Sequence, residues 1–179
     1  MINVVAHFQV EHVRFLNEQG EPVQPLPAFA REALALVPLY RAMVLTRAFD
    51  AKAIALQRTG KLGTFASALG QEAIGVGTAS AMRAEDVLLP SYRDHAAQML
   101  RGVTMVEILL YWGGDERGSN FAASRHDFPN CVPIATQICH AAGVACAMQL
   151  RREPRAAVCI FGDCATSKGD FYEAMNIAG

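Results

Sequence analysis

The sequence has almost no excess of charge of either sign, and its charged residues form no long run. It contains 16 basic and 17 acidic side chains among 179 residues, a formal net charge of −1. Basic stripes with interleaved aromatic residues, which are typical of nucleic-acid binding, are also missing. Apolar residues make up 52% of the chain, on the high side for a globular protein. These features argue against disorder and against a nucleic-acid partner, and they predict a folded domain with some apolar surface for subunit interfaces.

Patterns typical of disulfides and zinc sites are missing as well. The five cysteines are odd in number, no Cys-x-x-Cys pair occurs, and most of them lie in apolar runs. We therefore expect reduced, mostly buried thiols, as in a cytoplasmic protein. The first 25 residues contain neither an apolar signal core nor an Arg/Ser-rich leader, so nothing indicates export or organelle import.

One long stretch, Val132–Leu150, has 19 residues without Asp, Glu, Lys or Arg. That length approaches a membrane span, but the stretch contains Pro133, His140 and two glutamines. We interpret it as a buried helix with His140 in the core, and we expect no contact with a membrane.

Apolar periodicity and turn residues predict an N-terminal extended arm over 1–27 and an α/β domain over 28–179. The expected helices cover residues 28–58, 71–82, 95–101, 104–112 and 134–152, and the expected strands cover residues 87–89 and 156–161. We expect Pro38 to break the first helix, because an interior proline costs about 3 kcal/mol. The second helix is rich in small residues, which predicts close packing. Strands that alternate with helices predict a mostly parallel sheet.

A pattern with chemical meaning stands at the C-terminal end. The β-prone run Ala156–Phe161 stops at Gly162 and Asp163, and a turn of small residues follows before a helical segment. Ligands of parallel α/β proteins lie beyond the carboxyl ends of the strands. An aspartate there can hold a divalent metal, and the free amides of the turn can face a phosphate. The pattern predicts a site for a metal-bound diphosphate.

Six short motifs follow one another along the chain. They are Leu39–Arg41 with Arg47–Asp50, Gly70–Ala73, Ser91–His95, Trp112–Glu116, Thr136–Gln137 and Gly162–Asn176. In this order they resemble the α subunit of the thiamine-diphosphate-dependent dehydrogenase of 2-oxo acid dehydrogenase complexes, of the pyruvate and branched-chain type. The resemblance runs from about Leu34 to the C-terminus. It implies the thiamine-diphosphate-binding fold, a mostly parallel α/β sheet flanked by helices, in incomplete form.

The resemblance also assigns roles by position. It implies that Asp163 binds the magnesium of the cofactor, that Tyr92 and Arg93 reach the diphosphate oxygens, and that Ile134 lies beneath the aminopyrimidine ring. The cofactor-binding residues that it implies are Tyr92, Arg93, Ile134, Gly162, Asp163, Cys164 and Ala165. A loop that binds a monovalent cation in some members is matched by Cys131, Pro133, Thr136 and Gln137. No catalytic residue is assigned, because the glutamate that activates the cofactor belongs to the β subunit in this family.

Local chemistry leaves simpler alternatives open for these residues. Asp163 would also suit a cap of the following turn, Arg93 would suit an ion pair with Asp94 or a helix carboxylate, and Tyr92 would suit a half-buried aromatic position. We expect His95 to be structural rather than a proton carrier.

Two departures from the family pattern affect the cofactor site. Cys164 stands where the family has the second glycine of Gly-Asp-Gly. Its side chain would crowd the diphosphate, and it would be strained if the backbone there required glycine. In the family, an Asn-Asn pair with a further metal ligand and a catalytic-loop histidine come later in the chain, beyond the position of Gly179. We therefore expect these residues to hold only part of one subunit's share of the site.

The function that the resemblance implies is decarboxylation of a 2-oxo acid, with pyruvate favoured, and transfer of the acyl unit to a lipoyl group on a partner acyltransferase. It also implies a β subunit as the partner in an α2β2 assembly. Branched-chain 2-oxo acids or acetoin are alternative substrates. A non-enzymatic fragment or pseudoenzyme that keeps only the assembly surface is a further alternative. An unrelated nucleotide-binding domain is disfavoured, because no dinucleotide fingerprint and no P-loop motif occurs.

We predict that the isolated 179-residue chain binds magnesium and thiamine diphosphate weakly or not at all, because the second metal ligand and the β subunit are missing from it. Isothermal titration calorimetry measures this affinity directly. A submicromolar dissociation constant for the isolated chain would contradict the prediction.

Overall fold

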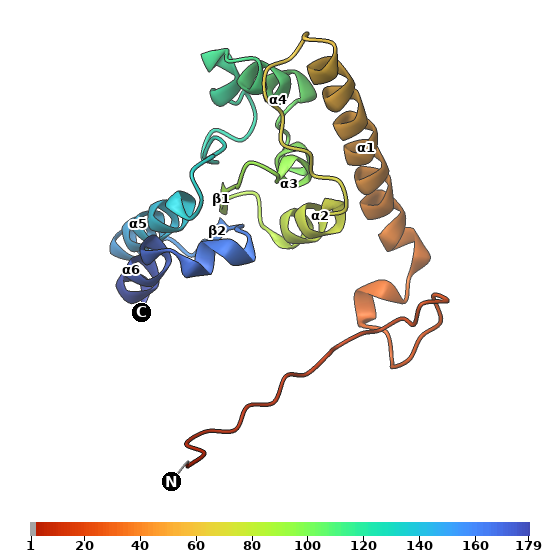
Figure 1. Ribbon diagram of the computed structural model, residues 1–179, viewed down its shortest axis with the longest axis vertical. Helices are drawn as coiled ribbons and strands as arrows, with labels where there is room; N and C mark the ends of the chain where they lie inside the picture. Colours follow the sequence, from red (N-terminus) through yellow and green to blue (C-terminus); the bar gives the residue numbers. More distant parts are fainter. Residues whose placement is uncertain (1–2) are drawn as a thin grey trace. The chain divides into compact units, whose positions relative to one another are not determined.

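The computed structural model describes residues 3–179 (Figure 1). Contacts within the chain divide it into two compact units, Met1–Pro38 and Leu39–Gly179. The second unit contains both strands and all of the residues predicted to bind a cofactor.

The first unit is largely irregular. A single antiparallel bridge joins Leu16 to Pro22, around a turn in which the Asn17 side chain accepts hydrogen bonds from two backbone N–H groups. The short 3-10 helix η1 covers Ala28–Ala30. Regular structure is therefore sparse before the first long helix.

Helix α1 covers Ala33–Arg58 and continues through Pro38, so the predicted break there is wrong. A proline inside a helix removes one hydrogen bond, here to the carbonyl of Leu34. Leu34 is 85% exposed, so water can satisfy that carbonyl. The loss of this hydrogen bond near the exposed start of the helix therefore costs little free energy, and α1 continues.

The second unit alternates helices with two short strands. Its elements after α1 are α2 (Glu72–Ala81), β1 (Val87–Leu89), α3 (His95–Leu100), α4 (Met105–Trp112), η2 (Glu116–Ser119), α5 (Thr136–Arg151), β2 (Ala157–Cys159), η3 (Asp163–Ser167) and α6 (Gly169–Ala178). The two strands pair in parallel with the register Val87↔Ala157, Leu88↔Val158 and Leu89↔Cys159. Helix α5 packs on both strands and α6 packs on α5 (Figure 1). The prediction of an α/β fold with a parallel sheet and flanking helices is confirmed.

Strand β1 is held on both edges. Val87 and Leu89 bond to β2. Leu88 faces the opposite edge, because successive residues of a strand point their hydrogen-bonding groups to opposite sides. There its N–H donates to Oδ1 of Asp127 over 2.8 Å, and its carbonyl accepts from the N–H of Phe128 over 2.9 Å. The long loop before α5 thus covers the free edge of β1, and all three residues of the strand are buried.

A buried ion pair anchors that loop. Nε of Arg101 lies 2.5 Å from Oδ2 of Asp127, and the two side chains are only 9% and 2% exposed. The same guanidinium donates to the carbonyl of Asp86 over 2.6 Å. Arg101 follows α3 directly, so one side chain connects α3, the start of β1 and the loop. Removing either charge would leave the other buried and unpaired, which is strongly destabilising.

Helices α2 and α3 approach closely at Gly75. A Cβ atom at this position would lie 2.8 Å from Cβ of Ala96 and 2.9 Å from the backbone nitrogen of Ala97. No side chain fits in that space without movement of α3. The close packing predicted from the small residues of α2 is confirmed at this position.

Two predictions about burial are wrong. Three of the five free cysteines are exposed, namely Cys139, Cys146 and Cys164, and the other two are half-buried. Helix α5 buries one face only, and His140 lies on the exposed part. A helix that covers a two-stranded sheet contacts it along one stripe, and the absence of charged residues did not identify that stripe.

Among residues 3–179, no helix combines the length and the hydrophobicity that crossing a bilayer requires.

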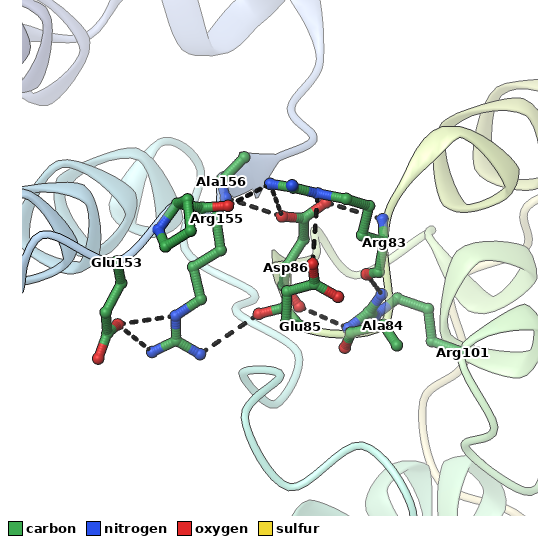
Figure 2. A network of polar contacts seen from close by, with 9 residues as sticks. Arg83, Ala84, Glu85, Asp86, Arg101, Glu153, Arg155 and Ala156 are labelled. Atoms are coloured by element: carbon green, nitrogen blue, oxygen red, sulfur yellow. Dashed lines mark hydrogen bonds and ion pairs between the residues drawn. The ribbon is translucent and has the colours of Figure 1, made fainter.

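The amino ends of the two strands are tied together by Asp86, which immediately precedes β1. Its Oδ2 accepts from the N–H of Arg83 and its Oδ1 from the N–H of Ala156, each over 2.8 Å. In the same network, Arg155 donates to the carbonyl of Glu85 over 3.3 Å (Figure 2). These backbone bonds hold the pKa of Asp86 below its usual value. The carboxylate therefore fixes the register of β1 against β2.

We predict that Asp86→Asn lowers the free energy of unfolding by about 1 to 3 kcal/mol, because an amide cannot accept both backbone N–H groups. The pKa of Asp86 is lower in the folded state. Its contribution is therefore complete above the unfolded value of about 4 and is lost as the pH falls through the folded value. Urea unfolding across this pH range measures both effects.

The matched control for Asp86 is Glu85→Gln. The Glu85 side chain is 55% exposed and lies 3.6 Å from Nε of Arg83, a separation at which exposed pairs contribute little. Equal losses of stability for Asp86→Asn and Glu85→Gln would show that Asp86 does not set the register.

Candidate functional site

A cavity of about 300 Å³ lies beyond the carboxyl ends of β1 and β2. Its wall is formed by the turn after β1, the start of α5, the segment after β2 and the start of α2. The lining residues are Ser91–Asp94, Ile134, Gln137, Ile160–Ala165, Gln71 and Ile74. All seven residues predicted to bind a cofactor are among them, although they come from three separate segments.

The turn after β1 presents Tyr92 and Arg93 to the cavity. The turn is closed by Asp94, whose Oδ2 accepts from the N–H of Ser91 over 2.7 Å. The guanidinium of Arg93 donates to the carbonyl of Ser67 and lies 5.1 Å from the centre of the Tyr92 ring. Arg93 has no carboxylate partner within the described residues 3–179, so the alternative of an ion pair is wrong there. Most of its donors are left for another acceptor, since a guanidinium carries five N–H groups.

Asp163 begins the 3-10 helix η3 and lines the cavity with an exposed side chain. The turn is closed by other groups: the N–H of Ala165 donates to the carbonyl of Gly162 over 3.0 Å, and the hydroxyl of Thr166 donates to the carbonyl of Asp163 over 2.7 Å. No side-chain cap is formed, so the alternative of Asp163 as a cap of this turn is wrong. Throughout the described part of the chain, its carboxylate forms no ion pair.

The backbone around Cys164 does not require glycine. Residues with a positive φ other than glycine are Ala135 and Arg152 in the described chain, so Cys164 lies in a region open to any residue. Gly162 has a φ of −80°, and a Cβ there would meet nothing within 4 Å. The condition under which Cys164 would be strained is therefore not met. Its side chain still lines the cavity.

The start of α5 supplies the opposite wall. Ala135 caps the helix with a φ of 75° and is fully buried, a left-handed conformation that costs roughly 1 to 2 kcal/mol for a residue with a Cβ. Gln137 donates through Nε2 to the carbonyl of Ile160 over 3.1 Å, which ties α5 to the end of β2. Its Oε1 is buried without a partner in the described residues. An acceptor in this state suits a ligand that brings an N–H group.

Sequence reasoning missed part of the wall. Asp94 is a second carboxyl in the cavity, and burial raises its pKa above the usual value. It stands inside the predicted Ser91–His95 motif, so its position after a strand was a usable signal. Phe161, the last residue of the predicted strand, carried the same signal. Gln71 and Ile74 gave none, because only the packing of α2 brings them to the strand ends. Of the four residues matched to a cation loop, Gln137 lines the cavity.

His95 is structural, as predicted. It is fully buried, its ring stacks on Phe65 at 5.0 Å between centroids, and Nε2 lies 3.2 Å from the carbonyl of Ala66. Burial lowers its pKa, which favours the neutral ring. The residue supports the loop before α2 and is not part of the cavity wall.

The carboxylates in the cavity do not form a complete metal site. No group of three or more His, Cys, Asp or Glu side chains in residues 3–179 is arranged to hold a metal. Asp163 stands alone at its turn. A single carboxylate such as that of Asp163 suits a hard cation such as magnesium. This ion commonly takes one or two carboxylates and completes its shell with phosphate oxygens and water.

Comparison with known proteins identifies the family of the chain. The chain matches the family described as dehydrogenase E1 component over residues 40–179. A pyruvate dehydrogenase E1 component subunit alpha from Mycoplasma pneumoniae is 40% identical over 162 residues, which cover 90% of this chain and 45% of the relative. The subunit of the same name from Mycoplasma genitalium is 36% identical with the same coverage. A 3-methyl-2-oxobutanoate dehydrogenase subunit alpha from Mycobacterium tuberculosis is 39% identical over 140 residues, which cover 78% of this chain and 38% of the relative.

Parallel strands flanked by helices, with a cavity at the carboxyl ends of the strands, define an α/β protein. Within that class, the chain belongs to the dehydrogenase E1 component family. The resemblance seen in the six motifs is thereby confirmed. The chain spans about half the length of the curated relatives it matches.

We predict that Cys164→Gly lowers stability by about 0.4 to 1 kcal/mol relative to Cys164→Ala, because glycine adds backbone freedom to the unfolded chain and relieves no strain here. Urea unfolding of the two variants gives the difference. A more stable glycine variant would show that the native backbone at this position is strained after all.

Proposed function

We propose that this chain is part of the α subunit of a 2-oxo acid dehydrogenase that uses thiamine diphosphate and magnesium. The reaction is decarboxylation of a 2-oxo acid, preferably pyruvate, and transfer of the acyl unit to a lipoyl group on a partner acyltransferase. The observation that carries the proposal is the convergence of Tyr92, Arg93, Ile134 and Gly162–Ala165 on one cavity at the strand ends.

The charges of the cavity favour a diphosphate bound together with a cation. Among the lining residues, Arg93 is basic, whereas Asp94 and Asp163 are acidic. A diphosphate alone would meet two carboxylates and one guanidinium. A divalent cation at Asp163 reverses that balance, because it adds two positive charges at the point where the phosphate oxygens arrive.

Each polar group has a task that its geometry suits. Thiamine diphosphate, when bound, supplies the nucleophilic carbon and the electron sink for decarboxylation. The fork of Arg93 would hold phosphate oxygens, which a planar guanidinium binds through two N–H groups. Tyr92 would add a hydroxyl donor. Asp163 would hold the magnesium ion, and the unpartnered Oε1 of Gln137 offers an acceptor to an N–H group of the ligand.

The apolar wall has a separate task. Ile134, Ile160 and Phe161 line the cavity beside these polar groups. Their side chains would exclude water from the ring system, which strengthens the electrostatic interactions around it. We assign the proton-transferring base to a β subunit in an α2β2 assembly, in keeping with the resemblance on which the proposal is based.

The preference for pyruvate is based on the extent of similarity. Relatives named as pyruvate dehydrogenase subunits match 90% of this chain or more, and the relative named for 3-methyl-2-oxobutanoate matches 78%. Both acids therefore belong in the assay.

The test is coexpression of this chain with the β subunit of a pyruvate dehydrogenase, followed by dye reduction with pyruvate or with 3-methyl-2-oxobutanoate. We predict reduction with pyruvate, and a loss of about a hundredfold for Asp163→Asn, since a neutral amide holds a divalent cation poorly.

The control for this assay is Asp170→Asn. Asp170 is a carboxylate on α6 that pairs with Lys168 over 3.3 Å, with both side chains 47% exposed. The Asp170→Asn variant should keep its rate of dye reduction within about twofold of the unchanged chain, as expected for the loss of a surface ion pair. No reduction by any assembly would favour the non-enzymatic alternative, and equal rates for Asp163→Asn and the unchanged chain would remove Asp163 from the metal site.

A further inference from the structure

Asp50 is a buried carboxylate to which the proposed chemistry gives no task. It lies on α1, within the second unit, and is 4% exposed. Its Oδ2 accepts from the hydroxyl of Ser67 over 2.7 Å, and its Oδ1 accepts from the N–H of Ala68 over 2.6 Å. It forms no ion pair within residues 3–179. Burying an ionised group is costly unless such bonds compensate, so these two bonds hold the segment before α2 firmly against α1.

The same segment receives the phosphate-binding candidate of the cavity. The Nη1 group of Arg93 donates to the carbonyl of Ser67. Ser67 is therefore held from two sides, by Asp50 through its hydroxyl and by Arg93 through its carbonyl. The position of the Arg93 fork depends on the position of that carbonyl.

Further contacts make the segment stiff. The carbonyl of Ala66 lies 3.2 Å from Nε2 of His95, and the ring of Phe65 stacks on the same histidine. Phe65 and Ala66 directly precede Ser67 in the sequence. The segment before α2 thus connects a carboxylate on α1 with the guanidinium in the cavity.

We propose that Asp50 is a positioning residue of the diphosphate site, which acts through Ser67 to hold the guanidinium of Arg93 in the orientation that binds phosphate oxygens. The inference rests on the proposed function. Without the bonds from Asp50, Ser67 loses its anchor and Arg93 samples more rotamers. Binding must then order both groups, and the affinity for the anion falls.

A double-mutant cycle of Asp50→Asn and Arg93→Ala tests this link on the chain assembled with the β subunit of a pyruvate dehydrogenase. The dissociation constant for inorganic pyrophosphate in excess magnesium is measured by NMR titration into the millimolar range. We expect Asp50→Asn to weaken binding about threefold to tenfold when Arg93 is present, and less than about twofold in the Arg93→Ala background. The Nε–Hε resonance of Arg93 in the ligand-free chain should shift or broaden in Asp50→Asn.

Glu107→Gln is a matched control. Glu107 also accepts from a hydroxyl and from a loop N–H, those of Thr104 and Ala122, over 2.7 and 2.8 Å, but it is not part of the cavity wall. We expect this variant to lose stability and to keep its pyrophosphate affinity. Where Asp50→Asn fails to fold, Ser67→Ala removes the hydroxyl link to Asp50, together with the bond that this hydroxyl accepts from the N–H of Leu69 over 3.2 Å. It enters the same cycle with a smaller expected effect.

Equal losses of affinity with and without Arg93, or an unchanged Arg93 resonance in Asp50→Asn, would overturn the positioning role. An unchanged chain that shows no pyrophosphate-dependent shift in the assembly with the β subunit would overturn the diphosphate site itself, and the positioning role with it. The resonance of the ligand-free chain separates these two failures, because it reports the link between Asp50 and Arg93 without any bound anion.

Discussion

The parallel pairing of β1 with β2 brings together turns that lie far apart in the sequence. Ser91 and Gly162 follow strands that run in the same direction, so both turns end at one edge of the sheet. A shift of one residue in this pairing would turn every side chain of one strand to the other face and would move the two turns apart. Asp86 prevents such a shift at the amino ends, where it accepts from backbone groups beside both strands.

The motif residues divide into those that face the cavity and those that support them. Tyr92, Arg93 and Asp163 face the cavity. Glu72 of the Gly70–Ala73 motif instead pairs with Arg47 at 2.5 Å, and this hydrogen bond lowers the pKa of Glu72 to about 2. Like Asp50, Glu72 is a nearly buried carboxylate. Its pair with Arg47 holds α1 against the start of α2, whereas Asp50 holds the segment that precedes α2. The motif with Arg47–Asp50 thus concerns the frame of the site, whereas Gly70–Ala73 serves both the frame and the wall, because Gln71 lines the cavity.

Two unusual residues at or beside the cavity, Ala135 and Cys164, differ in the backbone energy that they cost. Ala135 adopts a left-handed conformation while fully buried, and such strain persists only where the surroundings enforce it. The bond from Gln137, in the first turn of α5, to the end of β2 contributes to that enforcement. Cys164, in contrast, replaces a glycine of the family pattern without backbone strain. Its effect on a ligand is steric and depends on how closely a diphosphate approaches.

Local sequence determined the strand–turn–helix pattern, the parallel α/β class and the residues of the cavity that follow strands, because turn chemistry and apolar periodicity act over a few residues. It also predicted the structural role of His95. Tertiary packing decided the rest: which face of α5 is buried, why α1 continues through Pro38, and how the loop with Asp127 covers β1. It also decided that Gln71 and Ile74 join the wall. These features depend on contacts between segments distant in the chain, where water access and the neighbouring atoms set the cost of each conformation, and no local pattern contains that information.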